Sequence, residues 1–198
     1  MLLINSLIGP FDFETAEGLG ANTAYQVLDH IQKGKKKAED NLNKFLKGEI
    51  NAEQVSDNED FDVLSRAYIP YSSIDEDTEA LNLKQGMAFA SVYIKAFDTD
   101  NDGAMTVQEA GPVGQIIDSI DQTGKITPGK FLSWLIFQDC SDVLNGVLSP
   151  VEVKRSLLVV NNDPAFVVEK LKEIYNGYKI NELERDFELP LPKQGSFN

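Results

Sequence analysis

The sequence predicts an all-α fold in which helices alternate with short loops, and in which short β pairing joins neighbouring loops. Three observations support this prediction. Apolar residues recur at helical spacing along much of the 198-residue chain. Four stretches repeat a glycine, an apolar residue and a helix-capping Asn, Ser or Thr in the same order. One of these stretches belongs to an acidic loop in which oxygen-bearing side chains alternate with other residues.

The N-terminal third is predicted to be helical. It contains two apolar faces at helical spacing, formed by Tyr25, Val27, Leu28 and Ile31 and by Leu42, Phe45 and Leu46. His30, the only histidine, lies on the first helix without a neighbouring Cys or Ser motif. The sequence also has no Gly-rich phosphate loop or nucleophile elbow. We therefore expect no catalytic activity of its own.

A helix followed by a cation-binding loop is predicted next. The helix carries apolar residues at Leu83, Met87, Val92, Ile94 and Phe97. Ca²⁺ takes about six to eight oxygen ligands, and a short loop supplies them from alternating positions. Gly103, at the sixth position, allows the chain to turn around the ion. The expected ligands are Asp98, Asp100, Asp102, the Ala104 carbonyl, the Thr106 hydroxyl or a water bound to it, and both carboxylate oxygens of Glu109.

This segment resembles the EF-hand family, and residues 98–109 match its loop at every side-chain ligand position. The resemblance implies a calcium site within a helix-loop-helix scaffold, with Mg²⁺ competing for the site. It also implies a short strand at Met105 that pairs with one at Ile126 or Ile50. The alternative interpretation is an acidic surface turn without a metal, because loops of this composition also occur outside EF-hands.

Three further stretches are similar to EF-hand loops that have lost their metal. Their turning glycines are Gly48, Gly124 and Gly146. In the middle copy, Ser119, Asp121 and Thr123 retain oxygens, but Lys130 places a cation where a bidentate carboxylate belongs. In the first copy, Phe45 and Lys47 occupy positions that would need oxygens, so no calcium is expected there. A second calcium site at Gly146 would need a distorted or longer loop. Ordinary turns followed by capped helices are the alternative for all of them.

The residues after each loop predict where helices begin. Gly111 and Pro112 follow Glu109 closely, so the helix leaving the calcium loop should be a single turn. A helix after Pro128 carries four apolar residues, expected in the core or lining a groove for a partner helix: Phe131, Trp134, Leu135 and Phe137. A later helix, begun by Asp163 and Pro164, should turn four apolar residues inward: Phe166, Val167, Leu171 and Ile174.

The domain organisation is predicted from charge and proline content. Residues 1–189 form a single EF-hand-like domain, or two lobes at about 1–60 and 75–189. The acidic segment 53–79 would link these lobes, and residues 190–198 would form a mobile, proline-punctuated tail.

Composition narrows the class of protein. A formal net charge of −14 predicts a surface that repels nucleic acid and attracts cations and basic partners. The single cysteine, Cys140, excludes an internal disulfide framework. No apolar run approaches the roughly 20 residues of a membrane helix. With no secretory signal recognised, we expect a cytoplasmic protein without a membrane span or a nucleic-acid partner.

These features lead to one expected function and two alternatives. We expect a calcium-binding protein with one strong Ca²⁺ site that binds a protein partner. In the first alternative, calcium is a static clamp in a structural module, which the single intact loop and the Gly-Pro break favour. In the second, the chain is a non-catalytic regulatory subunit of an enzyme.

Overall fold

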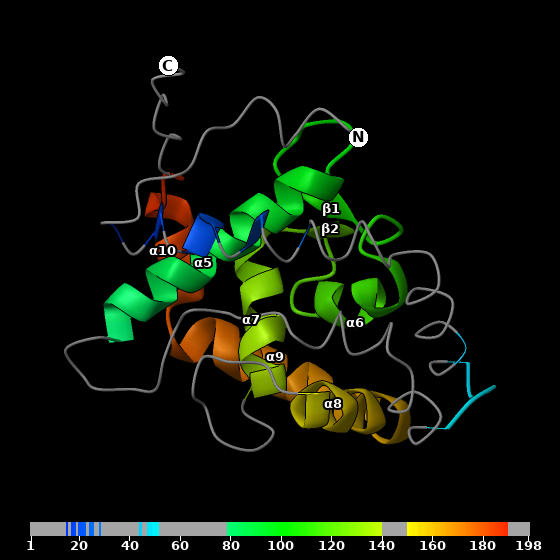
Figure 1. Cartoon of the computed structure of the whole chain (residues 1–198). Helices are drawn as coiled ribbons and strands as arrows, with labels where there is room; N and C mark the ends of the chain where they lie inside the picture. Colours follow the sequence, from blue (N-terminus) through cyan, green and yellow to red (C-terminus); the bar gives the residue numbers. More distant parts are fainter. Residues whose placement is uncertain are drawn as a thin grey trace.

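The computed structural model describes residues 79–139 and 150–189, together with residues 15, 17, 18, 20–22, 24, 25, 28, 44 and 47–51. The described part is mostly helical and contains a two-stranded antiparallel sheet, as predicted (Figure 1). Its elements are α5 (Glu79–Phe97), β1 (Met105–Thr106), the 3-10 helix η1 (Gly111–Val113), α6 (Gly114–Asp118), β2 (Lys125–Ile126), α7 (Pro128–Asp139), α8 (Pro150–Asn162), α9 (Pro164–Gly177) and α10 (Ile180–Asp186). None of these helices is both long and apolar enough to cross a membrane.

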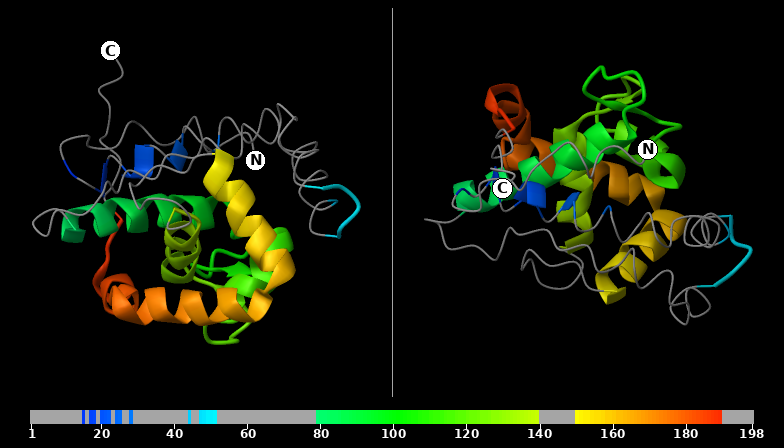
Figure 2. Two further views of the ribbon diagram at one scale, coloured as in Figure 1. Left: turned by 90° about the horizontal axis from the view of Figure 1, so that it is seen from below. Right: turned by 45° about the horizontal axis from the view of Figure 1, so that its top comes forward.

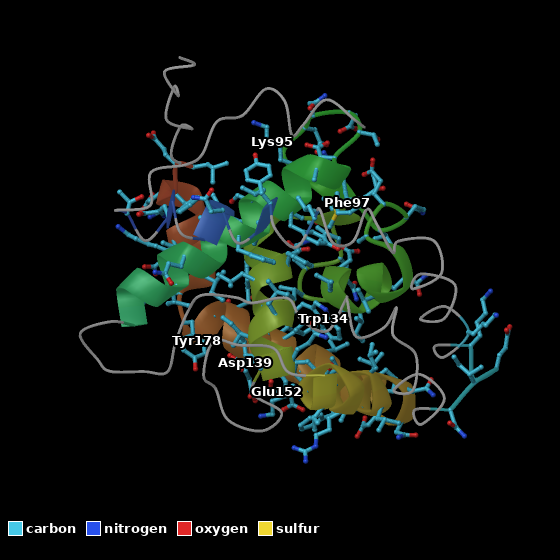
Figure 3. All side chains as sticks on the ribbon, viewed as in Figure 1. Lys95, Phe97, Trp134, Asp139, Glu152 and Tyr178 are labelled. Carbon is cyan, nitrogen blue, oxygen red and sulfur yellow. The ribbon has the colours of Figure 1, made fainter. Side chains whose placement is uncertain are left out.

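Helix α7 lies at the centre of the described part. Helices α5, α8, α9 and α10 all pack against it, and Figure 2 shows it between α5 and α9. Its residues from Gly129 to Asp139 are all buried, and they include Trp134, which is labelled in Figure 3. The four apolar residues predicted on this helix therefore belong to the core, which confirms the core interpretation over the groove.

Helix α5 packs along α7 and delivers the chain to the acidic loop. Tyr93 stacks on Phe131 of α7 with ring centroids 4.6 Å apart, and it also contacts Phe97 at the loop end of α5 (Figure 3). The N-terminal residues that the structure describes reach the same core, where Ala21 and Ala24 are fully buried. The sequence thus folds α5 between this N-terminal segment and α7.

The predicted linker, apart from Glu79, and the tail 190–198 lie outside the described residues. The division into one domain or two lobes therefore stays a prediction.

The C-terminal helices differ from the prediction in one side chain. Asp163 caps α9 by accepting a hydrogen bond from the backbone N–H of Phe166 at 3.1 Å. Val167 and Leu171 are buried as predicted, and Ile174 is half-buried. Phe166 was predicted to face inward, but its exposed fraction is 42% because it lies on the solvent side of the first turn.

Candidate metal centre

The loop between α5 and β1 brings three predicted ligands together. One carboxylate oxygen from each of Asp98, Asp100 and Asp102 lies within 4.8 Å of the other two. Asp98 is nearly buried at the end of α5, while the other two side chains are exposed. Three carboxylates at this separation repel one another unless a cation lies between them, so the arrangement suits a metal ion.

Backbone hydrogen bonds hold these carboxylates inside the turn. Asp98 accepts from the N–H of Gly103 at 2.8 Å, and both Asp98 and Asp100 accept from the N–H of Asp102 at 3.2 Å. The chain reverses through positive φ angles of 59° at Asn101 and 87° at Gly103. The second value lies in a region that L side chains rarely adopt, so glycine is required there.

Glu109 lies beside this cluster and is not a member of it. Its Oε2 accepts from the N–H of Thr106 at 2.7 Å, while the Thr106 hydroxyl oxygen accepts from the N–H of Glu109 at 3.2 Å. This reciprocal pair is a capping box. The other carboxylate oxygen of Glu109, Oε1, accepts hydrogen bonds from both the N–H and the hydroxyl of Thr99. The hydrogen bonds from Thr106 and Thr99 lower the pKa of Glu109 to about 2, so it is ionised at neutral pH.

The two remaining predicted ligands lie at β1. Ala104 is buried just before the strand, and Thr106 is half-buried within it. The Thr106 hydroxyl donates to Oε2 of Glu109 at 3.0 Å. After this strand the chain makes one turn, closed by a bond from the N–H of Ala110 to the Thr106 carbonyl at 3.0 Å, and then enters η1. The single turn predicted from the Gly-Pro pair is confirmed.

The sheet joins this loop to a second one. Met105 pairs with Ile126, and Thr106 pairs with Lys125, in antiparallel register. Of the two partners predicted for Met105, the structure selects Ile126, whereas Ile50 lies in a bend. The two loops therefore share one ladder of backbone hydrogen bonds.

A lysine from the second loop already contacts the acidic cluster. The Lys125 ammonium forms a hydrogen-bonded ion pair with Oδ2 of Asp102, although the two residues are 23 positions apart. The contact lowers the pKa of Asp102, chiefly through the hydrogen bond, and raises the pKa of Lys125. The cluster thus attracts a cation in the folded chain. Sequence spacing gave no sign of this pair, because it depends on how the loops face each other.

In the second loop, the cation is the side-chain ammonium of a lysine. The Lys130 ammonium contacts Oδ1 of Asp118, the Oγ1 of Thr123 at 2.7 Å, Oδ1 of Asp121 and the Lys125 carbonyl. The predicted set of oxygens in this loop began at Ser119, but the Ser119 hydroxyl donates to the Ile116 carbonyl instead. Asp118 takes the first position because the second loop contains one more residue there.

These contacts also determine the ionisation of Asp121. Desolvation alone would raise the pKa of Asp121, but hydrogen bonds from Lys130 and Thr123 outweigh it and lower the pKa. The Asp121 carboxylate is therefore held in its ionised form beside the ammonium.

The other two predicted loops are only partly described. Gly48 has a positive φ of 73°, and the N–H of Glu49 donates to the Lys44 carbonyl at 2.8 Å, which is typical of a helix end. The loop around Gly146 lies outside the described residues. Neither the absence of calcium expected at Gly48 nor the second site considered at Gly146 is therefore tested.

Comparison of the chain with protein-family models, with curated proteins and with solved structures gives no match. The metal site is therefore inferred from the residues and geometry of the loop.

Proposed function

We propose that the loop Asp98–Glu109 binds one calcium ion and that the chain is an EF-hand-like calcium-binding protein. The observation that carries this proposal is the convergence of three carboxylates within 4.8 Å in a loop closed by the β1–β2 ladder. All candidate ligands are oxygens, without histidine or thiolate, and such a set suits hard cations. A twelve-residue loop with this spacing favours Ca²⁺ over Mg²⁺, which demands stricter octahedral geometry.

The ion would be held by the residues that the loop already orients. Asp98, Asp100 and Asp102 supply carboxylate oxygens, Ala104 its carbonyl, and Thr106 its hydroxyl or a bound water. Glu109 completes the shell only after it gives up its contacts with Thr99, and Lys125 must leave Asp102. Calcium binding therefore replaces one set of charge contacts by another within a formed loop.

Between the proposed roles, a static clamp is supported best. A calcium-driven switch needs a helix that moves when Glu109 moves, but here the chain leaves through one turn into η1. The aromatic residues suited to a partner groove are buried in α7. Partner binding remains the second candidate role, because Val151 and Phe166 are large exposed apolar side chains among the described residues. A regulatory subunit of an enzyme is compatible with either role.

Calorimetric titration with CaCl₂ tests the calcium site. The wild type is expected to bind one ion, and Glu109→Gln should weaken binding at least about 100-fold, since loss of even an outer contact costs 10–100-fold. Glu182→Gln on α10 is the matched control and should leave the affinity unchanged. Two or more tight sites, or equal affinity in Glu109→Gln, would contradict the proposal.

Fluorescence separates the clamp from the partner-binding role. A clamp predicts that calcium changes neither the emission of buried Trp134 nor the binding of an apolar dye. A partner-binding protein that opens with calcium should change both.

A further inference from the structure

A buried ammonium group lies in the second loop, from Asp118 to Lys130. The Lys130 side chain is 1% exposed, and burying a charge of this kind is costly unless it is paired and hydrogen-bonded. Two carboxylates, one hydroxyl and one backbone carbonyl surround its nitrogen, from Asp118, Asp121, Thr123 and Lys125. All four of these contacts are oxygens, which is the kind of shell that a metal ion takes in an acidic loop.

The two loops turn in a similar way after their third position. Gln122 and Gly124 have φ angles of 57° and 76°, close to the 59° and 87° of Asn101 and Gly103. The N–H of Thr123 donates to Asp121 at 3.2 Å, as the N–H two residues after Asp100 donates to Asp100 at 3.2 Å.

The first and last positions of the two loops also correspond. Gly124 donates its N–H to Asp118 at 2.9 Å, as Gly103 donates to Asp98 at 2.8 Å. Lys130 occupies the position in the second loop that Glu109 occupies in the first. In the second loop, four oxygens therefore surround an ammonium, whereas we propose that the corresponding oxygens of the first loop surround a metal ion; the four come from Asp118, Asp121, Thr123 and the Lys125 carbonyl.

We propose that Lys130 is the resident cation of the second loop, whose ammonium takes the place of a metal ion and keeps the loop folded without one. The same group fixes the first loop indirectly. Lys130 binds the Lys125 carbonyl, Lys125 belongs to β2, and β2 pairs with β1 beside the acidic cluster. This second step rests on the calcium site proposed above, whereas the role of Lys130 in its own loop does not.

Thermal unfolding in EDTA tests the first step. Lys130→Met removes the ammonium but keeps most of the apolar stem, leaving two carboxylates without their cation. The Tm should fall by about 10 °C, given about 3–5 kcal/mol for breaking a buried pair and about 2–4 °C per kcal/mol. The matched control is Lys172→Met on α9, which should leave the Tm within about 2 °C of the wild type. Equal Tm values for the two variants would overturn the proposal.

A gain of metal binding tests whether the shell is built for a cation. Lys130→Glu in the Glu109→Gln background places a carboxylate at the last position of the second loop, where the first loop has Glu109, while calcium binding by the first loop is weakened. Titration with CaCl₂ should then detect one new site, and calcium should raise the Tm. The double variant Glu109→Gln with Lys172→Glu adds the same charge and should gain no site.

The outcomes separate this inference from the proposed function. If the wild type binds no calcium, the proposed function fails, but the Tm loss in Lys130→Met and the new site still support the resident cation. If Lys130→Glu folds and binds no calcium, Lys130 forms only an ordinary ion pair with the loop, and the inference fails. If Lys130→Glu does not fold even with calcium, the Tm of Lys130→Met decides.

Discussion

The two loops joined by the sheet turn in a similar way but differ in the charge of the residue that ends them. Each gathers side-chain oxygens around a point, and each needs positive charge there. The first ends in Glu109, and the exposed ammonium of Lys125 contacts Asp102 in its aspartate cluster. The second ends in Lys130, whose buried ammonium is covered by the loop itself. The two loops therefore differ in the charge of their last residue, which is the Glu109 carboxylate in the first loop and the Lys130 ammonium in the second.

The difference between the two loops suggests how the second loop supports the first. If Lys130 is the resident cation that we propose, the second loop is folded at any calcium concentration and β2 is formed before calcium binds. Calcium binding to the first loop would then have a lower ordering cost.

Transplanting the lysine should convert the first loop into the second kind. Glu109→Lys is expected to abolish calcium binding, because an ammonium would replace the bidentate carboxylate. At a calcium concentration about 1,000 times Kd, the wild type should gain about 4 kcal/mol of unfolding free energy and the variant none. Urea unfolding with and without calcium measures the difference. A calcium-dependent gain in the variant would mean that Glu109 is not a ligand.

Truncating the first position of the second loop should identify which residue occupies it. Asp118→Ala removes the acceptor of Gly124 and one partner of Lys130, and should cost about 2–4 kcal/mol. Ser119→Ala removes only a local hydroxyl contact and should cost under about 1 kcal/mol. Urea unfolding in EDTA compares the two variants. The reverse order of effects would restore the register that begins at Ser119.

Removing the lysine that crosses between the loops should strengthen calcium binding. In Lys125→Gln, calcium no longer displaces an ammonium from Asp102, so its affinity should rise about two- to fivefold, the range of an exposed ion pair. The increase should shrink in high salt. Lys172→Gln changes the net charge equally and serves as the control in the same calorimetric titration. Weaker binding in Lys125→Gln would mean that this lysine supports the loop instead of competing with the ion.

The smallest effect concerns pH in the absence of calcium. The pKa of Glu109 is lowered from 4.5 to about 2, so its contacts with Thr99 and Thr106 stabilise the fold fully above pH 4.5. This contribution is lost as the pH falls toward about 2. The Tm of Glu109→Gln in EDTA should therefore lie slightly below that of the wild type at pH 6, and the two should converge in acid. A constant difference across this range would contradict the assigned contacts.

Local sequence patterns predicted the elements but not the contacts between them. Turn and capping residues predicted where α7 and α9 begin, whereas the pairing of Met105 with Ile126 or Ile50 was expected from the resemblance to EF-hand loops. These signals are local, so a single sequence displays them. The aspartates of the first loop were predicted together because all three lie within one turn of chain.

The second loop was predicted less well, for a physical reason. Lys130 was noticed as a cation in a carboxylate position, but spacing cannot show that its long side chain bends into the loop. Asp118 was missed because one additional residue shifts the start of the loop, and only the hydrogen bond from Gly124 reveals the shift. The sequence does contain a chemical indication of this contact. A lysine that follows several oxygen-bearing residues at the spacing of a metal-binding loop can occupy the position of the metal ion.

A residue on α10 also forms a hydrogen bond with the start of α7. Glu184 on α10 accepts hydrogen bonds from the N–H of Gly129 at 2.7 Å and from the hydroxyl of Tyr175 at 3.2 Å. Burial and the nearby Glu184 carboxylate raise the pKa of Tyr175 to about 12, which keeps this hydroxyl a donor. Because Gly129 and Glu184 are 55 positions apart, this contact forms only after α9 and α10 have docked. We therefore expect the amide hydrogen of Gly129 to exchange with solvent only when α10 separates from α7.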